Sequence, residues 1–218
     1  MDFEKVSTYI ESLYENRKLT KKQYTKDTEL KKFVPVVDDE VARMLQVLIT
    51  LGKPQKILEI GTSVGFSTVS MAKAVKAYGG KITTIEFDAK VAEQAVKNFE
   101  REKVADQIEV KIGDAREIIP ILTEQYDLIF QDVGDKALYA ALLEKRVRLL
   151  KPGGLLVAEN TLFPVIDLDK DISPDVEAKW EKMKEALAKF NKKVADCPRL
   201  ESTLLPIGDG FTVAVKKE

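Results

Sequence analysis

The side chains in this sequence that could do chemistry stand at the ends of predicted strands. Acidic or amide residues end or follow the apolar runs in order along the chain, at Glu59, Glu86, Asp114, Asp132, and Glu159 with Asn160. A carboxylate in the place of Glu86 can accept two hydrogen bonds from ribose hydroxyls, as acids do in nucleotide-binding folds. Asp114, beside the small Ala115, could bond an adenine amino group, and it is equally typical of a helix N-cap. Five such strand ends together favour a ligand site along one edge of a sheet.

A glycine turn marks the first of these strand ends. From Lys56 a short run rich in leucine and β-branched residues ends in the acidic Glu59, Gly61 and Gly65 follow it, and apolar residues at helical spacing begin directly afterwards. Glycine allows the backbone to approach a ligand closely and to take positive φ, and the free N–H groups of the next helix would face the crevice above the sheet. The spacing is not the Gly-x-Gly-x-x-Gly of dinucleotide binders, so it does not predict a pyrophosphate cradle. The alternative is that both glycines only allow tight packing of strand against helix.

Strands and helices alternate along most of the chain and must position these residues. The patterns predict strands at 56–60, 82–86, 108–112, 126–131 and 155–158, helices at 39–51, 89–102, 115–122, 138–150 and 174–190, and a C-terminal hairpin of 199–205 with 211–216. Repeated strand–helix units predict an α/β fold with a doubly wound, mostly parallel sheet of seven strands and an antiparallel hairpin at its edge. In such sheets ligands bind beyond the carboxyl ends of the strands, where the polar residues stand.

Composition limits the possible classes of protein. The 218 residues, of which 44% are hydrophobic, suit one domain, and 35 basic against 36 acidic side chains do not favour nucleic acid or a membrane surface as partner. Cys197 is the single cysteine, which excludes an internal disulfide and fits the cytoplasm, and we expect neither a signal peptide nor a membrane span. Histidine is absent, which excludes histidine bases, Ser-His-Asp triads and histidine metal sites. Residues 1–32 are charged and of helical pattern, and we expect them outside the main core.

Six short motifs follow one another in a familiar order. They are Leu-Glu-Ile-Gly at 58–61, Ile-Glu-Phe-Asp at 85–88, Gly-Asp-Ala at 113–115, Tyr-Asp-Leu-Ile-Phe at 126–130, Leu-Lys-Pro-Gly-Gly at 150–154 and Leu-Pro-Ile-Gly-Asp-Gly at 205–210. Together they resemble the cation-dependent, S-adenosylmethionine-dependent O-methyltransferases of the catechol and caffeoyl-CoA type. The resemblance runs from about Val34 to the C-terminus, and it implies the Rossmann-like methyltransferase fold.

The resemblance implies a site for S-adenosylmethionine. It places Gly61 and Gly65 under the methionine part and Ser67 on its carboxylate. It places Glu86 on the ribose, Phe87 against the adenine, and Asp114 and Ala115 at the adenine edge. Val37, Glu59 and Asp132 would lie around the cofactor. For Ser67 the alternative is a hydroxyl at a helix start, and for Phe87 an aromatic residue of the core.

The resemblance also implies a metal site and a general base. Asp132, Glu159 and Asn160 take the places of the metal ligands, and oxygen ligands of this kind suit Mg²⁺, with Mn²⁺ or Ca²⁺ as substitutes. Lys136 takes the place of the general base, which would need a lowered pKa, and Asp132 would share in catalysis. The alternative for Lys136 is a solvated surface lysine.

Two departures from the family pattern concern this metal site. Glu159 stands where the family usually has aspartate, and the loop 132–136 is one residue longer than the usual form, so that Asp135 could share the role of Lys136. Both departures bear on metal affinity and metal preference.

Three functions remain open from the sequence. The first is methylation of a phenolic, catechol-like small molecule by a homodimer that uses residues 1–33 as interface or lid. The second is methylation of a hydroxylated base in tRNA, for which lysines in 17–32 could contact phosphates. The third is a non-catalytic S-adenosylmethionine-binding protein.

Overall fold

The computed structural model describes residues 3–14, 16, 19–26, 28–30, 34–167 and 173–218. Seven strands form one sheet in the order β3-β2-β1-β4-β5-β7-β6, in which β1 to β5 pair in parallel and β7 is antiparallel to both β5 and β6. The strands are β1 (Lys56–Ile60), β2 (Lys81–Glu86), β3 (Ile108–Ile112), β4 (Tyr126–Gln131), β5 (Leu150–Glu159), β6 (Leu200–Leu205) and β7 (Phe211–Lys216). The predicted mostly parallel sheet with an antiparallel C-terminal hairpin is therefore confirmed.

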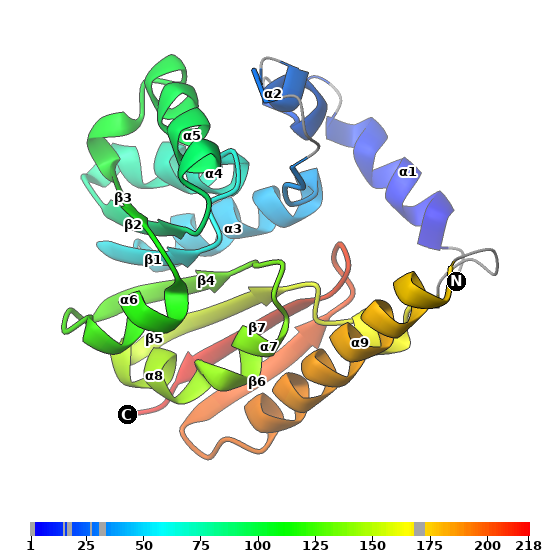
Figure 1. The fold of residues 1–218 in the computed structure, drawn as a ribbon. Helices are drawn as coiled ribbons and strands as arrows, with labels where there is room; N and C mark the ends of the chain where they lie inside the picture. The colour runs from blue at the N-terminus through cyan, green and yellow to red at the C-terminus, as the bar shows by residue number, and fades with distance from the viewer. Residues whose placement is uncertain (1–2, 15, 17–18, 27, 31–33, 168–172) are drawn as a thin grey trace.

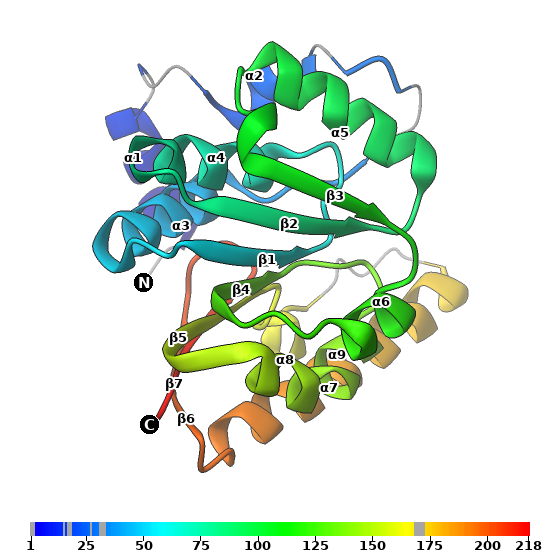
Figure 2. The same cartoon turned by 90° about the vertical axis from the view of Figure 1, so that its left-hand side faces the viewer.

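The helices cover both faces of this sheet (Figures 1 and 2). On one face lie α3 (Asp39–Gly52), α4 (Phe66–Val75) and α5 (Ala89–Arg101), and on the other α6 (Ala115–Ile121), α7 (Ala137–Ala141), α8 (Leu143–Leu149) and α9 (Pro174–Ala195). Side chains alternate along a strand, so Leu128 and Phe130 of β4 pack under the first set and Ile129 packs under the second. Two apolar cores result, one on each face.

Three predicted elements differ from the structure by more than one residue. The helix predicted at 138–150 is divided at Leu142, whose φ of −96° and ψ of 0° are not helical, into α7 and α8. Strand β5 begins at Leu150, before the glycine turn at 153–154, and the register with β4 shifts between Tyr126 and Leu128. Helix α9 continues five residues beyond the predicted end, to Ala195.

The N-terminal region contains two helices, α1 (Phe3–Tyr14) and α2 (Lys21–Lys26). The expectation that residues 1–32 lie outside the main core is wrong for α2. Its Tyr24 is 1% exposed, packs in the same core as α3 and α4, and donates a hydrogen bond of 2.8 Å to the carbonyl of Val64. Residues 31–33, 27, 17–18, 15 and 1–2 of this region lie outside the described residues.

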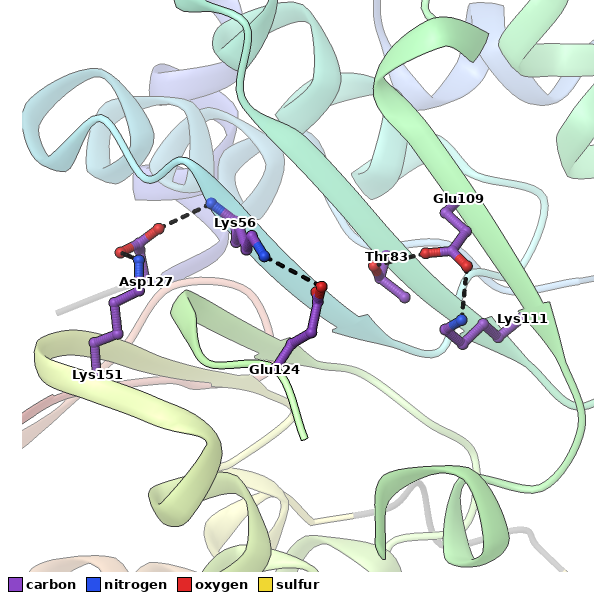
Figure 3. A network of polar contacts seen from close by, with 7 residues as sticks. All are labelled: Lys56, Thr83, Glu109, Lys111, Glu124, Asp127 and Lys151. Carbon is purple, nitrogen blue, oxygen red and sulfur yellow. Dashed lines mark hydrogen bonds and ion pairs between the residues drawn. The ribbon is translucent and has the colours of Figure 1, made fainter. Parts of the chain in front are cut away.

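Ion pairs connect strands at the amino end of the sheet, opposite the polar strand ends (Figure 3). Asp127 of β4 accepts hydrogen bonds from the backbone N–H of Lys56 at 2.8 Å and from Lys151 Nζ at 2.6 Å, and therefore joins β1, β4 and β5. Lys56 also pairs with Glu124 at 3.2 Å. Exposed pairs of this kind stabilise a fold by about 0–1 kcal/mol each.

No helix in the described ranges is both long and apolar enough to cross a membrane.

Candidate active site

A cavity of about 800 Å³ opens at the carboxyl ends of the parallel strands. It lies where β1 has β2 on one side and β4 on the other, which is the switch point at which α/β sheets bind ligands. Ten of the predicted site residues line it: Val37, Gly61, Glu86, Phe87, Asp114, Ala115, Asp132, Lys136, Glu159 and Asn160. Three predicted residues, Glu59, Gly65 and Ser67, are not on its wall.

The glycine turn serves both the cavity and the packing beneath it. Gly61 has φ of +99°, and a Cβ there would lie 1.9 Å from the carbonyl oxygen of Asp132, so only glycine lets the ends of β1 and β4 approach this closely. Gly65 has φ of +92°, and a Cβ there would lie 2.3 Å from Cε1 of Phe99. The packing interpretation therefore applies to Gly65, while Gly61 is both tightly packed and on the cavity wall.

Glu59 points beneath the turn and is fully buried. Its carboxylate accepts hydrogen bonds from three hydroxyls, those of Ser67 at 2.6 Å, Thr68 at 2.5 Å and Thr84 at 2.6 Å. Burial raises the pKa of Glu59 to about 7, against the lowering effect of these three hydroxyls. In this structure the Ser67 hydroxyl is directed to Glu59, which ties the start of α4 to the end of β1.

Glu86 and Phe87 lie at one end of the cavity. The Glu86 carboxylate accepts one backbone N–H at each oxygen, from Ser63 at 2.8 Å and from Asp88 at 3.0 Å, and each oxygen keeps a lone pair for a ligand hydroxyl. Phe87 is 74% exposed, so it is not an aromatic residue of the core, and its ring is available to a flat ligand. This part of the cavity therefore offers free acceptor lone pairs beside an exposed aromatic ring.

Asp114 serves as the N-cap of α6. Its side chain accepts the backbone N–H of Arg116 at 2.8 Å and the Arg116 guanidinium at 2.9 Å. These contacts, the backbone hydrogen bond first, lower the pKa of Asp114. The capping interpretation is therefore observed, and because Asp114 also lines the cavity it does not exclude contact with a ligand.

Lys136 lies at the other end of the cavity, among polar strand ends. Its side chain is 5% exposed, so the interpretation as a solvated surface lysine is excluded. Nζ donates a hydrogen bond to Oδ1 of Asn160 and lies 3.6 Å from Oδ1 of Asp132. Burial lowers the pKa of Lys136, and the neighbouring Asp132 opposes this effect. Lys136 therefore lines the cavity with an amine whose pKa is lowered by burial.

Glu159 is buried beside Lys136, at 3% exposure. No described residue donates a hydrogen bond to its carboxylate, and a Cβ at Gly208 would lie 3.3 Å from Oε1. Burial, and next the charge of Asp132, raise the pKa of Glu159 to about 9. The charge of the neighbouring Lys136 opposes this shift but does not outweigh it.

Asp135 takes part in a different interaction. Its carboxylate pairs with the Arg116 guanidinium and accepts the backbone N–H of Ala137 at 3.0 Å, at the start of α7. The residue next to Lys136 is therefore directed toward α6 and not toward Lys136.

Several cavity residues were not among the predicted site residues. Among them are Lys21 of α2, Asp38 before α3, Phe163 after β5 and Asp209 in the β6–β7 turn. Lys21 Nζ donates a hydrogen bond of 2.7 Å to Asp38, and burial, then Asp38, raise the pKa of Asp209. Asp209 stood within a motif of the resemblance, at 205–210, whereas the other three carried no sequence signal. Among the described residues, no group of three or more His, Cys, Asp or Glu is arranged to hold a metal ion.

Comparisons with known proteins identify the family. The model of the O-methyltransferase family matches residues 4–217. A catechol O-methyltransferase of Niastella koreensis is 32% identical over 190 residues, which cover 83% of this chain and 82% of that protein. The chain belongs to the O-methyltransferase family. A caffeoyl-CoA O-methyltransferase of Populus kitakamiensis is 30% identical over 211 residues, covering 93% of this chain and 85% of that protein.

Solved structures agree with this assignment. An O-methyltransferase of tomaymycin synthesis from Streptomyces achromogenes, solved in complex with SAM, is 26% identical with a TM-score of 0.78, and the match covers 100% of both chains. A methyltransferase of Podospora anserina is 22% identical with a TM-score of 0.85, covering 100% of this chain and 97% of that one, and shows the shared fold. The predicted O-methyltransferase of the catechol and caffeoyl-CoA type, with its Rossmann-like fold, is therefore confirmed.

Proposed function

We propose that this O-methyltransferase transfers the methyl group of S-adenosylmethionine to a hydroxyl of a catechol-like small molecule, assisted by a divalent cation. The observation that carries the proposal is a single cavity with Glu86 and Phe87 at one end and Lys136, Asp132 and Glu159 at the other. A donor molecule and an acceptor molecule can therefore lie in one continuous space, which direct transfer of a methyl group requires.

The cofactor end suits S-adenosylmethionine. Glu86 would accept the ribose hydroxyls, Phe87 would lie against the adenine, and the backbone at Gly61 would pass beneath the methionine part. The relative from Streptomyces achromogenes, solved with SAM, and an O-methyltransferase of Bacillus cereus, solved with SAH and 27% identical, support this choice of cofactor.

The acceptor end suits a divalent cation. Its donors are oxygens, from Asp132, Glu159 and Asn160, which hard cations such as Mg²⁺ prefer, with Mn²⁺ or Ca²⁺ as substitutes. The Glu159 carboxylate is buried, and the charge of Lys136 only partly offsets the effect of its burial, so a bound cation would add to that compensation. When bound, the cation would chelate two adjacent substrate hydroxyls and lower the pKa of one of them.

Lys136 would act as the general base. Its amine lines the cavity at hydrogen-bonding reach of Asn160, burial favours its neutral form, and it could take the proton of the acceptor hydroxyl. Phe163 and Met183 add apolar surface to the same end and would exclude water from an aromatic acceptor. Asp132, 3.6 Å from Nζ, would hold the protonated amine after transfer.

We also propose that the chain forms one domain and acts as a homodimer in which the N-terminal helices contribute to the interface. Tyr24 of α2 packs in the core of the sheet, which supports a domain that includes this region. Helix α1 presents Val6, Tyr9 and Leu13 exposed, at spacings of three and four residues that place them on one helix face. Sedimentation at micromolar concentration tests the dimer, and a monomer would contradict it.

An activity screen tests the reaction. Purified protein with S-adenosylmethionine and Mg²⁺ is expected to methylate members of a catechol panel and not bulk RNA, and EDTA is expected to abolish turnover. Asp132→Ala should lose turnover while its calorimetric affinity for the cofactor changes little, and Asp196→Ala, an exposed position at the end of α9, is the matched control.

The other outcomes assign the other functions. Methylation of RNA without any catechol product would replace the acceptor class. Cofactor binding without turnover on either substrate would favour a non-catalytic protein. Full turnover of wild type and Asp132→Ala in EDTA would show that no metal takes part.

A further inference from the structure

Lys136 is held on its buried side by aromatic rings. The hydroxyl oxygen of Tyr139 lies 3.4 Å from Nζ, and the centroid of the Tyr139 ring lies 5.1 Å away. The Phe163 ring lies 5.7 Å from Nζ. Both rings are within the distance at which an aromatic face attracts an ammonium group. Phe163 lines the cavity, whereas Tyr139 is fully buried behind it and is not part of its wall.

Tyr139 is itself fixed from three directions. Its ring meets the Phe190 ring of α9 edge-on, with centroids 5.4 Å apart and an interplanar angle of 79°. Its hydroxyl interacts electrostatically with the backbone N–H of Val133, and its carbonyl accepts a hydrogen bond from the buried guanidinium of Arg146. A side chain restrained in this way has one position for its hydroxyl.

The Tyr139 hydroxyl therefore interacts with residues at both ends of the loop 132–136. Val133 directly follows Asp132, and Lys136 lies three residues before Tyr139 on the same side of α7. Gly134 stands in the middle of the loop 132–136. A Cβ added at Gly134 would have no heavy atom within 4 Å, so packing does little to restrain the middle of this loop. The interactions of Tyr139 with Val133 and Lys136 therefore restrain a loop that its own packing leaves largely unrestrained.

We propose that Tyr139 is a positioning residue that holds the Lys136 amine and the backbone after Asp132 in their working arrangement. Tyr139 is not part of the cavity wall, so its hydroxyl would act through Lys136. The kinetic part of this proposal rests on the proposed methyl transfer, whereas the structural part, the restraint of Lys136, does not.

Kinetics of Tyr139→Phe test the proposal. This change removes the hydroxyl and keeps the ring that packs on Phe190. We expect kcat to fall on the order of tenfold to a hundredfold, as for a misplaced catalytic group, with KM and cofactor affinity within about twofold. Tyr126→Phe is the matched control, because Tyr126 is buried in the same core but lies at the amino end of β4, away from Lys136. A loss confined to Tyr139→Phe separates positioning from the general effect of removing a buried hydroxyl.

Acylation of Lys136 provides a readout that does not need activity. Acetic anhydride is applied at fixed pH, and modification at Lys136 is followed by peptide mass spectrometry against the exposed Lys182 as internal reference. We expect Lys136 to react several times faster in Tyr139→Phe than in wild type or Tyr126→Phe. If wild type has no methyltransferase activity, the proposed function fails while this measurement still decides the role of Tyr139.

Two results would overturn the proposal. They are an unchanged kcat in an active Tyr139→Phe enzyme and a wild-type rate of acylation at Lys136 in that variant. If Tyr139→Phe does not fold, Phe190→Leu removes the ring that braces Tyr139 and is expected to raise acylation in the same way. An unchanged rate in Phe190→Leu would then overturn it.

Discussion

The buried acid beneath the glycine turn makes the stability of this protein depend on pH. Glu59 is fully buried, and its pKa is raised to about 7 from the usual 4.5 because burial outweighs three donated hydroxyl hydrogen bonds. Between these two values the folded protein keeps a proton that the unfolded chain has released. Stability from this group is therefore fully present below pH 4.5 and is lost as the pH rises through about 7.

The size of this effect follows from the two pKa values. The difference between pKa values of about 7 and 4.5 corresponds to roughly 3 kcal/mol of unfolding free energy, and solvent does not screen this fully buried group. Most of it is lost between pH 5 and pH 8. Glu59→Gln keeps the size of the side chain and removes its titration, so we expect the variant to lose this part of the pH dependence.

Urea unfolding at several pH values between 5 and 8 measures the effect. The quantity to compare is the difference between wild type and Glu59→Gln in how the unfolding free energy depends on pH. Other carboxyls with a raised pKa, such as Glu159, contribute similarly in both proteins and largely cancel in this difference. Glu185→Gln, at an exposed position of α9, should keep the wild-type dependence. Parallel curves for wild type and Glu59→Gln would refute the reasoning and would show that the three hydroxyls keep Glu59 ionised in the folded protein.

Three further changes test other parts of the site. Glu86→Ala should weaken S-adenosylmethionine binding by about 2–3 kcal/mol, because charge-assisted bonds to the ribose are lost, and equal affinity in calorimetry would remove Glu86 from the cofactor site. Glu159→Asp should weaken Mg²⁺ or Mn²⁺ binding measured by titration calorimetry, if the longer side chain compensates for the longer loop; tighter binding would contradict this. Gly65→Ala should destabilise the fold by at least about 1–3 kcal/mol in urea, because its Cβ would lie 2.3 Å from Phe99 at a φ of +92°, and wild-type stability would argue against that strain.

The sheet could be predicted because each buried strand is a short apolar run between a turn and a polar end. The predicted runs at 108–112, 126–131 and 211–216 coincide with β3, β4 and β7. The break at Leu142 could not be predicted, because residues 138–150 keep helical apolar spacing throughout. The break lies between Tyr139 and the buried Arg146, whose guanidinium donates a hydrogen bond to the Tyr139 carbonyl near the end of α7. A buried arginine with a carbonyl partner is a tertiary contact that no local pattern reveals.

The direction of a strand-end side chain was the part of the site hardest to predict. Glu59 and Glu86 each stand near the end of a strand, but Glu59 faces α4 and bonds its hydroxyls, whereas Glu86, the last residue of β2, reaches the cavity. Sequence places both acids near the carboxyl edge, and only the alternation within the folded sheet decides which one meets a ligand. The same limit applies to Ser67, which follows the glycine turn and yet bonds Glu59.

The two ends of the cavity are built from different parts of the chain, and this bears on how the enzyme selects an acceptor. Residues 61–115, in the first half of the sheet, supply Gly61, Glu86 and Phe87, and the turn and the cap hold them through backbone hydrogen bonds. The acceptor end combines Lys136 with Lys21 from the N-terminal region and Asp209 from the C-terminal hairpin. In the described part of the chain, the C-terminal hairpin makes no hydrogen bond to the glycine turn, whereas Tyr24 of α2 donates one to the Val64 carbonyl within it. Substitutions in the turn at 206–210 can therefore change the shape and charge around the proposed acceptor end while the proposed cofactor end is kept. Exchanging this turn between two relatives of the family should transfer acceptor preference with little change in cofactor affinity.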